Sequence, residues 1–282
     1  MFLDALTDTF IDGIKILPFL FVTYVLMEYI EHKAGSKAER FVKKSGRLGP
    51  VVGSILGVVP QCGFSAAAAN FYAGRIITLG TLISIFLSTS DEMLPILISE
   101  KVSPVLIFRI LGMKIVIGMI AGFVIDLILH RKGKEESEMR IEHMCDHEHC
   151  HCHEQNIFKS ALVHTLQIFA FIVVISFALN ILIAIVGEDK LGSFMTSVPA
   201  LGILLSGLIG LIPNCAASVV ITQLYLEGLL TMGSMMAGLL VGSGIGLLVL
   251  FRVNEDMKEN LKITTMLYVI GIACGFLIDL IL

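Results

Sequence analysis

Apolar residues occur along this chain in long runs, separated by short polar segments and by one long polar segment. The first half contains apolar runs at about 7–30, 49–59, 63–73, 76–98 and 104–129. The longest of them reach the roughly 20 residues that a helix needs to cross the hydrocarbon core of a bilayer. The second half has similar runs at about 158–186, 230–251 and 263–282, with two shorter ones on either side of 213–215. This pattern predicts an all-α integral membrane protein.

The composition also indicates a membrane protein rather than a soluble one. Hydrophobic residues make up 56% of the chain and charged residues 16%, and the mean hydropathy is +0.88. A soluble domain is typically about half apolar and about one quarter charged. The charges lie mainly in the polar segments, so the net charge of −4 does not indicate a nucleic-acid partner. We expect lipid around the chain and no nucleic acid bound to it.

One short motif occurs twice. Val-Pro-Gln-Cys-Gly-Phe-Ser at 59–65 corresponds to Ile-Pro-Asn-Cys-Ala-Ala-Ser at 212–218, and the shift from Cys62 to Cys215 is 153 residues. The same shift aligns identical residues further along the chain: Tyr72 with Tyr225, Gly80 with Gly233, Gly118 with Gly271, and 125–129 with 278–282. A register kept over this distance indicates a duplicated unit.

Each copy of the motif places Pro, a polar amide, Cys and Ser in the middle of an apolar segment. Pro interrupts a helix, so we expect each copy to form two half-helices joined at a Pro-x-Cys hinge. Inside a membrane, freed backbone groups and polar side chains are tolerated only where protein or a water-filled cavity satisfies them. The two hinges therefore predict two halves of one binding site, although the thiols alternatively pack as small apolar groups. The candidate substrate-binding residues are Gln61, Cys62, Ser65, Asn214, Cys215 and Ser218.

The distribution of charge predicts that the two copies have opposite orientations. Loop 31–48 is strongly basic, and basic loops face the cytoplasm. The equivalent loop of the second copy, from Gly187 onward, is net acidic and is expected outside. We therefore expect two inverted repeats of five helical pieces each, which is the architecture of secondary transporters. The expected organisation is a first repeat at 1–129, a cytoplasmic linker at 130–157 and a second repeat at 158–282.

Acidic residues distinguish the first copy from the second. Asp91 and Glu92 lie within an apolar run, whereas Gly and Ile stand at the equivalent positions of the second copy. Ionisable residues inside a membrane usually have a function. We expect one of these acids to bind a cation or a proton and the other to pair with Arg109 or Lys114. The alternative is that both are solvated near the outer membrane face.

The polar linker carries a dense group of thiol and imidazole side chains. Such groups bind borderline or soft metals such as Zn, Cu or Ni. We expect the linker to bind a transition metal ion, in a collecting or sensing role, although the spacing defines no particular coordination geometry. The candidate ligands are His143, Cys145, His147, His149, Cys150, His151, Cys152 and His153.

Small residues and acids recur near the end of each copy. Gly118 and Gly122, like their counterparts Gly271 and Gly275, have the spacing that lets helices approach closely. These glycines either pack the repeats together or form a homodimer. The equivalent acids Asp126 and Asp279 are expected to be interfacial and structural.

Several of these segments together resemble one bacterial membrane family. They are 60–65, 79–83, 88–92, 212–215 and 224–228. The chain is similar to ten-helix heavy-metal exporters whose members are labelled arsenic efflux proteins or manganese transporters. The resemblance implies two sets of five helices and a heavy-metal substrate. Arsenite would suit the thiol of Cys62 and Mn²⁺ would suit the acids. Ser90 stands where many relatives have Gly.

We therefore expect a multi-pass protein of the cytoplasmic membrane that exports a metal or metalloid ion, rather than an enzyme. The chain contains no Walker sequence, so transport would use an ion gradient or a partner ATPase. One alternative is a small-anion transporter that holds its substrate at half-helix N-termini. Another is a thiol-based membrane enzyme or sensor.

Overall fold

The computed structural model of the chain describes residues 48–58, 62–90, 93–131, 199–213 and 215–281. It also describes single helical positions between 14 and 25 and between 162 and 177. Every regular element in these parts of the chain is a helix, as the sequence predicts. Three helical stretches are long and apolar enough to cross a membrane: Pro104–Leu129, Met232–Val253 and Met257–Ile281.

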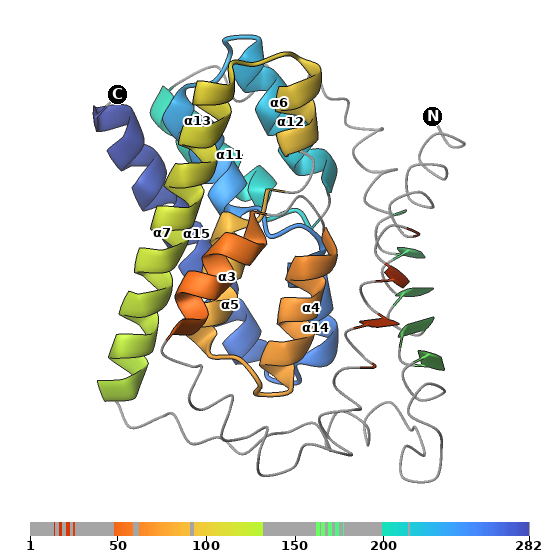
Figure 1. Ribbon diagram of the computed structural model, residues 1–282. Coiled ribbons are helices and arrows are strands. Elements are labelled where there is room, and N and C mark those ends of the chain that lie inside the picture. Colours follow the sequence, from red (N-terminus) through yellow and green to blue (C-terminus); the bar gives the residue numbers. More distant parts are fainter. Residues whose placement is uncertain are drawn as a thin grey trace, which may run out of the picture.

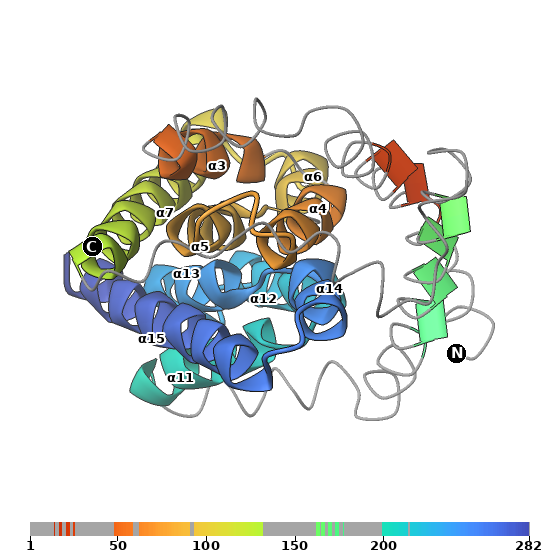
Figure 2. The ribbon, with the colours of Figure 1, turned by 90° about the horizontal axis from the view of Figure 1, so that it is seen from below.

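The described helices fall into two sequence-related sets. The first set comprises α3 (Gly49–Gly57), α4 (Cys62–Ala73), α5 (Leu79–Ser88), α6 (Met93–Ser99) and α7 (Pro104–Arg131). The second comprises α11 (Pro199–Gly210), α12 (Cys215–Leu226), α13 (Met232–Val241), α14 (Ile245–Val253) and α15 (Met257–Ile281). Viewed from below, the two sets form two adjacent layers (Figure 2).

The runs 76–98 and 230–251, each expected as one continuous piece, are interrupted helices. In the first set, α5 ends at Ser88 and α6 begins at Met93. In the second set, α13 ends at Val241 and α14 begins at Ile245, after Gly244 adopts a φ of 55°. Gly adopts a positive φ readily, and Gly244 does so immediately before α14 begins. Within the described residues, each of these two runs therefore forms two helices where one was expected.

The glycines of the long helices α7 and α15 allow them to approach α5 and α13 closely. A Cβ on Gly118 or Gly122 would meet the backbone carbonyl of Ser84 or Gly80 on α5. The equivalent glycines of α15 face α13 in the same way. Each pair of glycines thus contacts a helix of its own set, and α5 and α13 lie deepest in the molecule.

The outer surfaces of α7 and α15 are apolar and exposed. The exposed side chains include Val105, Phe108, Leu127, Leu280 and Ile281. In contrast, Leu82, Phe86, Met235 and Leu239 of α5 and α13 are buried. Apolar side chains on the outside of an apolar bundle are typical of a surface in contact with lipid. The protein is therefore a helical, multi-pass membrane protein.

The two long helices run in opposite directions. Figure 1 shows α7 descending toward the lower edge of the bundle, whereas α15 rises to the C-terminus at the upper edge. The shorter helices pack across the two sets, because α4 lies against α14 and α12 lies against α6. Elements from the first half of the sequence therefore have neighbours from the second half at both ends of the molecule.

Candidate functional site

The structure describes only part of the site predicted from the sequence. Gln61, Asn214, Asp91 and Glu92 lie outside the described residues, as do the eight His and Cys candidates of the linker. Cys62 and Cys215 are the first residues of α4 and α12, so each hinge Cys begins a helix. Ser65 and Ser218 occupy equivalent positions one turn later.

The residue described just before the first predicted hinge contacts the interruption between α5 and α6. The helix α3 ends at Gly57, and the next carbonyl, that of Val58, accepts a hydrogen bond from Ser90 Oγ. Ser90 lies between α5 and α6, immediately before Asp91. This bond places the chain that precedes the candidate acids beside the chain that enters the first hinge.

The start of α14 contacts the start of α4. Ser65 is fully buried, and a Cβ added to Gly246 would lie 2.6 Å from the Ser65 Cβ and 2.8 Å from its carbonyl carbon. The helix α14 begins one residue earlier, at Ile245. Two helices from different halves therefore begin side by side at the first hinge.

The second hinge has comparable neighbours. The helix α11 ends at Gly210, which lies against the Gly238 carbonyl of α13, and α12 begins at Cys215. The helix α12 then packs against α6, the helix that follows Asp91 and Glu92. The end of α11 therefore lies against α13 of its own half, and α12 packs against a helix of the first half.

Lys114 was predicted as a partner for one of the acids, and its position is unusual. Its side chain is fully buried, and Nζ donates a 2.6 Å hydrogen bond to the Leu239 carbonyl of α13. Arg109, the other predicted partner, is exposed on α7. The contact of Lys114 with a backbone carbonyl of the other half was not foreseen, because no pattern along the chain pairs positions so far apart.

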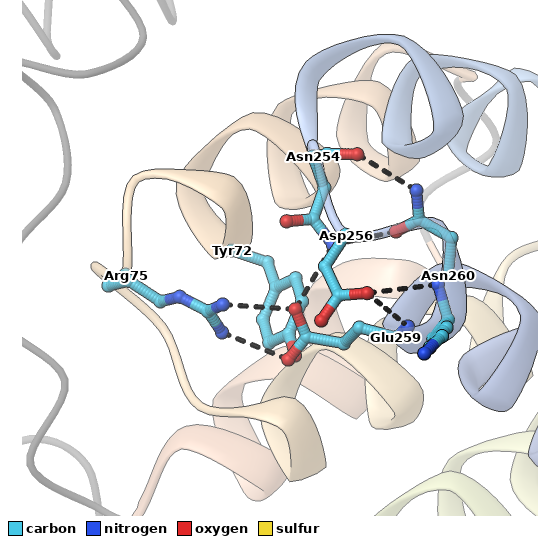
Figure 3. A network of polar contacts seen from close by, with 7 residues as sticks. Tyr72, Arg75, Asn254, Asp256, Glu259 and Asn260 are labelled. Carbon is cyan, nitrogen blue, oxygen red and sulfur yellow. Dashed lines mark hydrogen bonds and ion pairs between the residues drawn. The ribbon is translucent and has the colours of Figure 1, made fainter.

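A polar network that the sequence did not reveal joins the two halves at one end of the bundle. Arg75, in the turn after α4, forms a two-pronged ion pair with Glu259 of α15, with N–O distances of 3.1 and 2.9 Å. Tyr72 of α4 donates to the same carboxylate at 2.7 Å, and Asn254 donates to it at 3.1 Å. Asn254 Nδ2 also donates to Asn260 Oδ1 at 2.6 Å, and Asn260 Nδ2 donates to the backbone carbonyl of Asn254 at 2.9 Å (Figure 3).

The ion pair of this network has no counterpart by sequence in the other copy, although Tyr225 corresponds to Tyr72. Applying the shift of Cys62 to Cys215, Gly228 corresponds to Arg75 and Leu106 corresponds to Glu259. Both Arg75 and Gly228 adopt a positive φ, of 57° and 75°, so the turn is repeated while its charge is not. The only signal available in the sequence was this loss of symmetry in charged residues.

Within the described residues, no group of three or more His, Cys, Asp or Glu side chains is arranged to hold a metal ion. Cys274 on α15 is a free, half-buried thiol. The predicted linker site falls outside the described part of the chain and stays a prediction.

A protein-family model described as "Putative, 10TM heavy-metal exporter" matches residues 1–186, about two thirds of the 282 residues. The match includes the first hinge, α3 to α7 and the linker. No curated protein matches the chain, and no solved structure matches it.

Proposed function

The chain belongs to this family of ten-helix heavy-metal exporters, and on that premise we propose that it is a secondary transporter that moves a metal or metalloid ion out of the cytoplasm. The substrate is held where the two Pro-x-Cys hinges meet. The observation that supports this proposal is that helix ends from both halves meet beside the first hinge. Ser90 contacts Val58 there, and Gly246 contacts Ser65. Interrupted helices at a repeat interface are typical binding elements of secondary transporters.

We further infer that the two sets of helices are inverted repeats. Equivalent helices have equivalent neighbours: α5 packs on α7 as α13 packs on α15, and α4 packs on α14 as α6 packs on α12. The opposite directions of α7 and α15 support a twofold relation whose axis lies in the membrane plane. Such a relation brings the two hinges to the same depth from opposite sides.

We also infer the sidedness, and the ends of the first set support it. The start of α3 and the end of α7 lie at the same edge of the bundle in Figure 1. The basic loop 31–48 precedes α3, and the linker follows α7. Basic segments face the cytoplasm, so both the loop and the metal-binding linker lie on that side, where the linker collects ions before export.

Transport into inside-out vesicles tests the proposed function. We expect ATP-independent accumulation of one member of a panel containing arsenite, Mn²⁺, Zn²⁺, Ni²⁺ and oxyanions. Cys62→Ser and Asp91→Asn should each reduce the initial rate at least about tenfold, because each removes a ligand of the substrate. Deleting 143–153 should lower uptake only at low metal concentration. Cys274→Ser, a thiol outside the hinges, is the matched control and should transport normally.

The panel also distinguishes the alternatives. If an oxyanion accumulates and Asp91→Asn does not affect its accumulation, the substrate is a small anion rather than a cation. It would then be held at the starts of α4 and α14. Thiol-dependent turnover without solute accumulation would indicate a membrane enzyme or sensor. Absence of accumulation for every member of the panel would contradict the proposal of an exporter.

A further inference from the structure

Lys114 is a buried charged group that the proposed hinge site does not include. Its side chain is 0% exposed and projects from α7 of the first half. Its Nζ donates to the carbonyl of Leu239 on α13 of the second half at 2.6 Å. Burial of an ammonium inside a membrane protein is unfavourable unless surrounding groups stabilise it, so such residues usually have a function.

Lys114 lies at the depth of the helix interruptions. Along α7, Gly122 faces Gly80 and Gly118 faces Ser84, so the two helices run antiparallel with matching turns. One further turn of α7 brings Lys114 level with Ser88, the last residue of α5. The same depth holds the end of α13, because Lys114 reaches Leu239 there.

The Leu239 carbonyl belongs to the last turn of α13. In a continuous helix the backbone amide of Ser243 would donate to this carbonyl, but α13 already ends at Val241. The carbonyls of a last turn lack helical partners and carry a partial negative charge, which favours a cation. In transporters with interrupted helices, such carbonyl ends are places where coupling cations bind.

At the end of α5, the equivalent helix end in the first half, the carbonyls of the last turn accept hydrogen bonds from hydroxyl groups. Ser88 Oγ donates to the carbonyls of Ser84 and Ile85 at 2.7 and 3.1 Å, and Thr89 Oγ1 donates to Ile85 at 2.8 Å. Val241 and Gly242 stand at the positions of these two hydroxyl residues in the second half, and neither has a hydroxyl.

The second half also has no lysine equivalent to Lys114, because Leu267 of α15 stands at the corresponding position. The end of α5 is therefore bonded by neutral hydroxyls, and the end of α13 is bonded by an ammonium from the opposite half.

We propose that the Lys114 ammonium is a tethered cation, which occupies the carbonyl end of α13 where a small free cation would otherwise bind. It is a positioning residue: by holding the end of α13, it fixes where α14 begins beside Ser65 at the first hinge. A free coupling cation is then unnecessary at this point. The role of Lys114 in transport rests on the proposed transport function. The proposal that its ammonium takes the place of a cation does not.

Chemical rescue of Lys114→Ala tests the proposal, because it replaces the tethered cation with a free one. In the purified variant, ethylammonium should raise the thermal unfolding midpoint by several degrees, since a ligand that binds only the folded state stabilises it. Ethanol, which is similar in size but neutral, should not. In proteoliposomes, ethylammonium should raise the transport rate of the variant at least about fivefold, with no effect on the unsubstituted protein.

Lys258→Ala, which removes an exposed lysine of α15, is the matched control and should respond to neither compound. Equal rescue by ethanol and ethylammonium would overturn the proposal, because the site would then need only volume. Wild-type stability and transport of Lys114→Ala without any added cation would also overturn it.

A second pair of variants covers failure of Lys114→Ala to fold. Lys114→Arg keeps the charge, and Lys114→Met keeps the aliphatic stem without it. The proposal predicts that the Arg variant keeps the unfolding midpoint and the transport rate, whereas the Met variant loses at least about tenfold in transport rate. Equal behaviour of the two variants contradicts it. If the unsubstituted protein transports nothing, the exporter proposal fails, whereas the thermal measurements still decide whether Lys114 replaces a cation.

Discussion

Asp126 and Asp279 illustrate how single residues are repeated with their contacts. Asp126 accepts hydrogen bonds from Thr78 Oγ1 at 2.7 Å and from the Gly80 amide at 2.8 Å. Asp279 accepts from Thr231 Oγ1 and the Gly233 amide, both at 2.6 Å. Each Thr is itself the N-cap of its helix, α5 or α13. A carboxylate beside a helix N-terminus satisfies free amides and complements the helix dipole, so the expected structural role of both acids is confirmed.

Neutralising either acid tests this shared role. We expect Asp126→Asn and Asp279→Asn each to lower the free energy of unfolding by about 1–3 kcal/mol, the typical range for a hydrogen bond to a charged group. The measurement is the unfolding midpoint of the purified protein in detergent. Glu100→Gln, at an exposed acid, is the control and should leave the midpoint unchanged. Effects confined to one of the two aspartates would show that the roles are not equivalent.

Among the helices, close contact depends on a few glycines without a side chain. Gly80 on α5 lies against the Gly122 carbonyl and the Asp126 carboxylate, and Gly233 on α13 lies against the equivalent atoms of α15. A backbone carbonyl cannot move aside as a flexible side chain can, so these positions tolerate no Cβ. By contrast, Gly112 on α7 has no atom within 4 Å of an added Cβ.

Gly→Ala substitutions at these positions should therefore have opposite effects. We expect Gly80→Ala and Gly233→Ala to lower the free energy of unfolding by at least about 2 kcal/mol through overpacking. Gly112→Ala should be neutral or stabilise the protein by up to about 1 kcal/mol, because Ala favours a helix interior. Thermal melts of the three variants compare them directly. A tolerated alanine at Gly80 would mean that α5 and α7 are further apart than described.

At the scale of the whole molecule, the two halves are joined differently at the two ends of the bundle. The network of Tyr72, Arg75 and Glu259 connects α4 of the first half to α15 of the second at one end. The side chains of Arg75 and Glu259 are only 18% and 24% exposed, so water screens their ion pair less than a surface pair. Sequence equivalents of these two charges are missing from the other copy.

A double-mutant cycle measures what this ion pair contributes. Arg75→Gln and Glu259→Gln should each lower the free energy of unfolding by about 1–3 kcal/mol, because each leaves a partly buried charge without its partner. The double variant should lose less than the sum of the single losses, because coupled residues are not additive. Lys262→Gln, at an exposed position of α15, is the control. Additive losses in the double variant would mean that the two charges are not coupled.

The sequence by itself was sufficient for the class of protein and for the duplicated pattern. Apolar runs report the thickness of the bilayer, so an all-helical membrane protein is predicted without any contact information. The constant register from Cys62 to Cys215 identified equivalent positions, which include the acids and glycines that later proved to make equivalent contacts. The ten-helix exporter family was also correctly inferred from residues near the two hinges.

Only the tertiary structure decided where the helices are interrupted and which distant residues meet. The run 76–98 is apolar through most of its length, yet α5 ends at Ser88, where the hydroxyls of Ser88 and Thr89 bond carbonyls of the last turn. Lys114 and Leu239 are remote in the sequence, and a backbone carbonyl leaves no trace in residue identity. Hydrophobic periodicity depends on the local environment of each segment, whereas contacts between the halves depend on how the helices pack, which no single segment encodes.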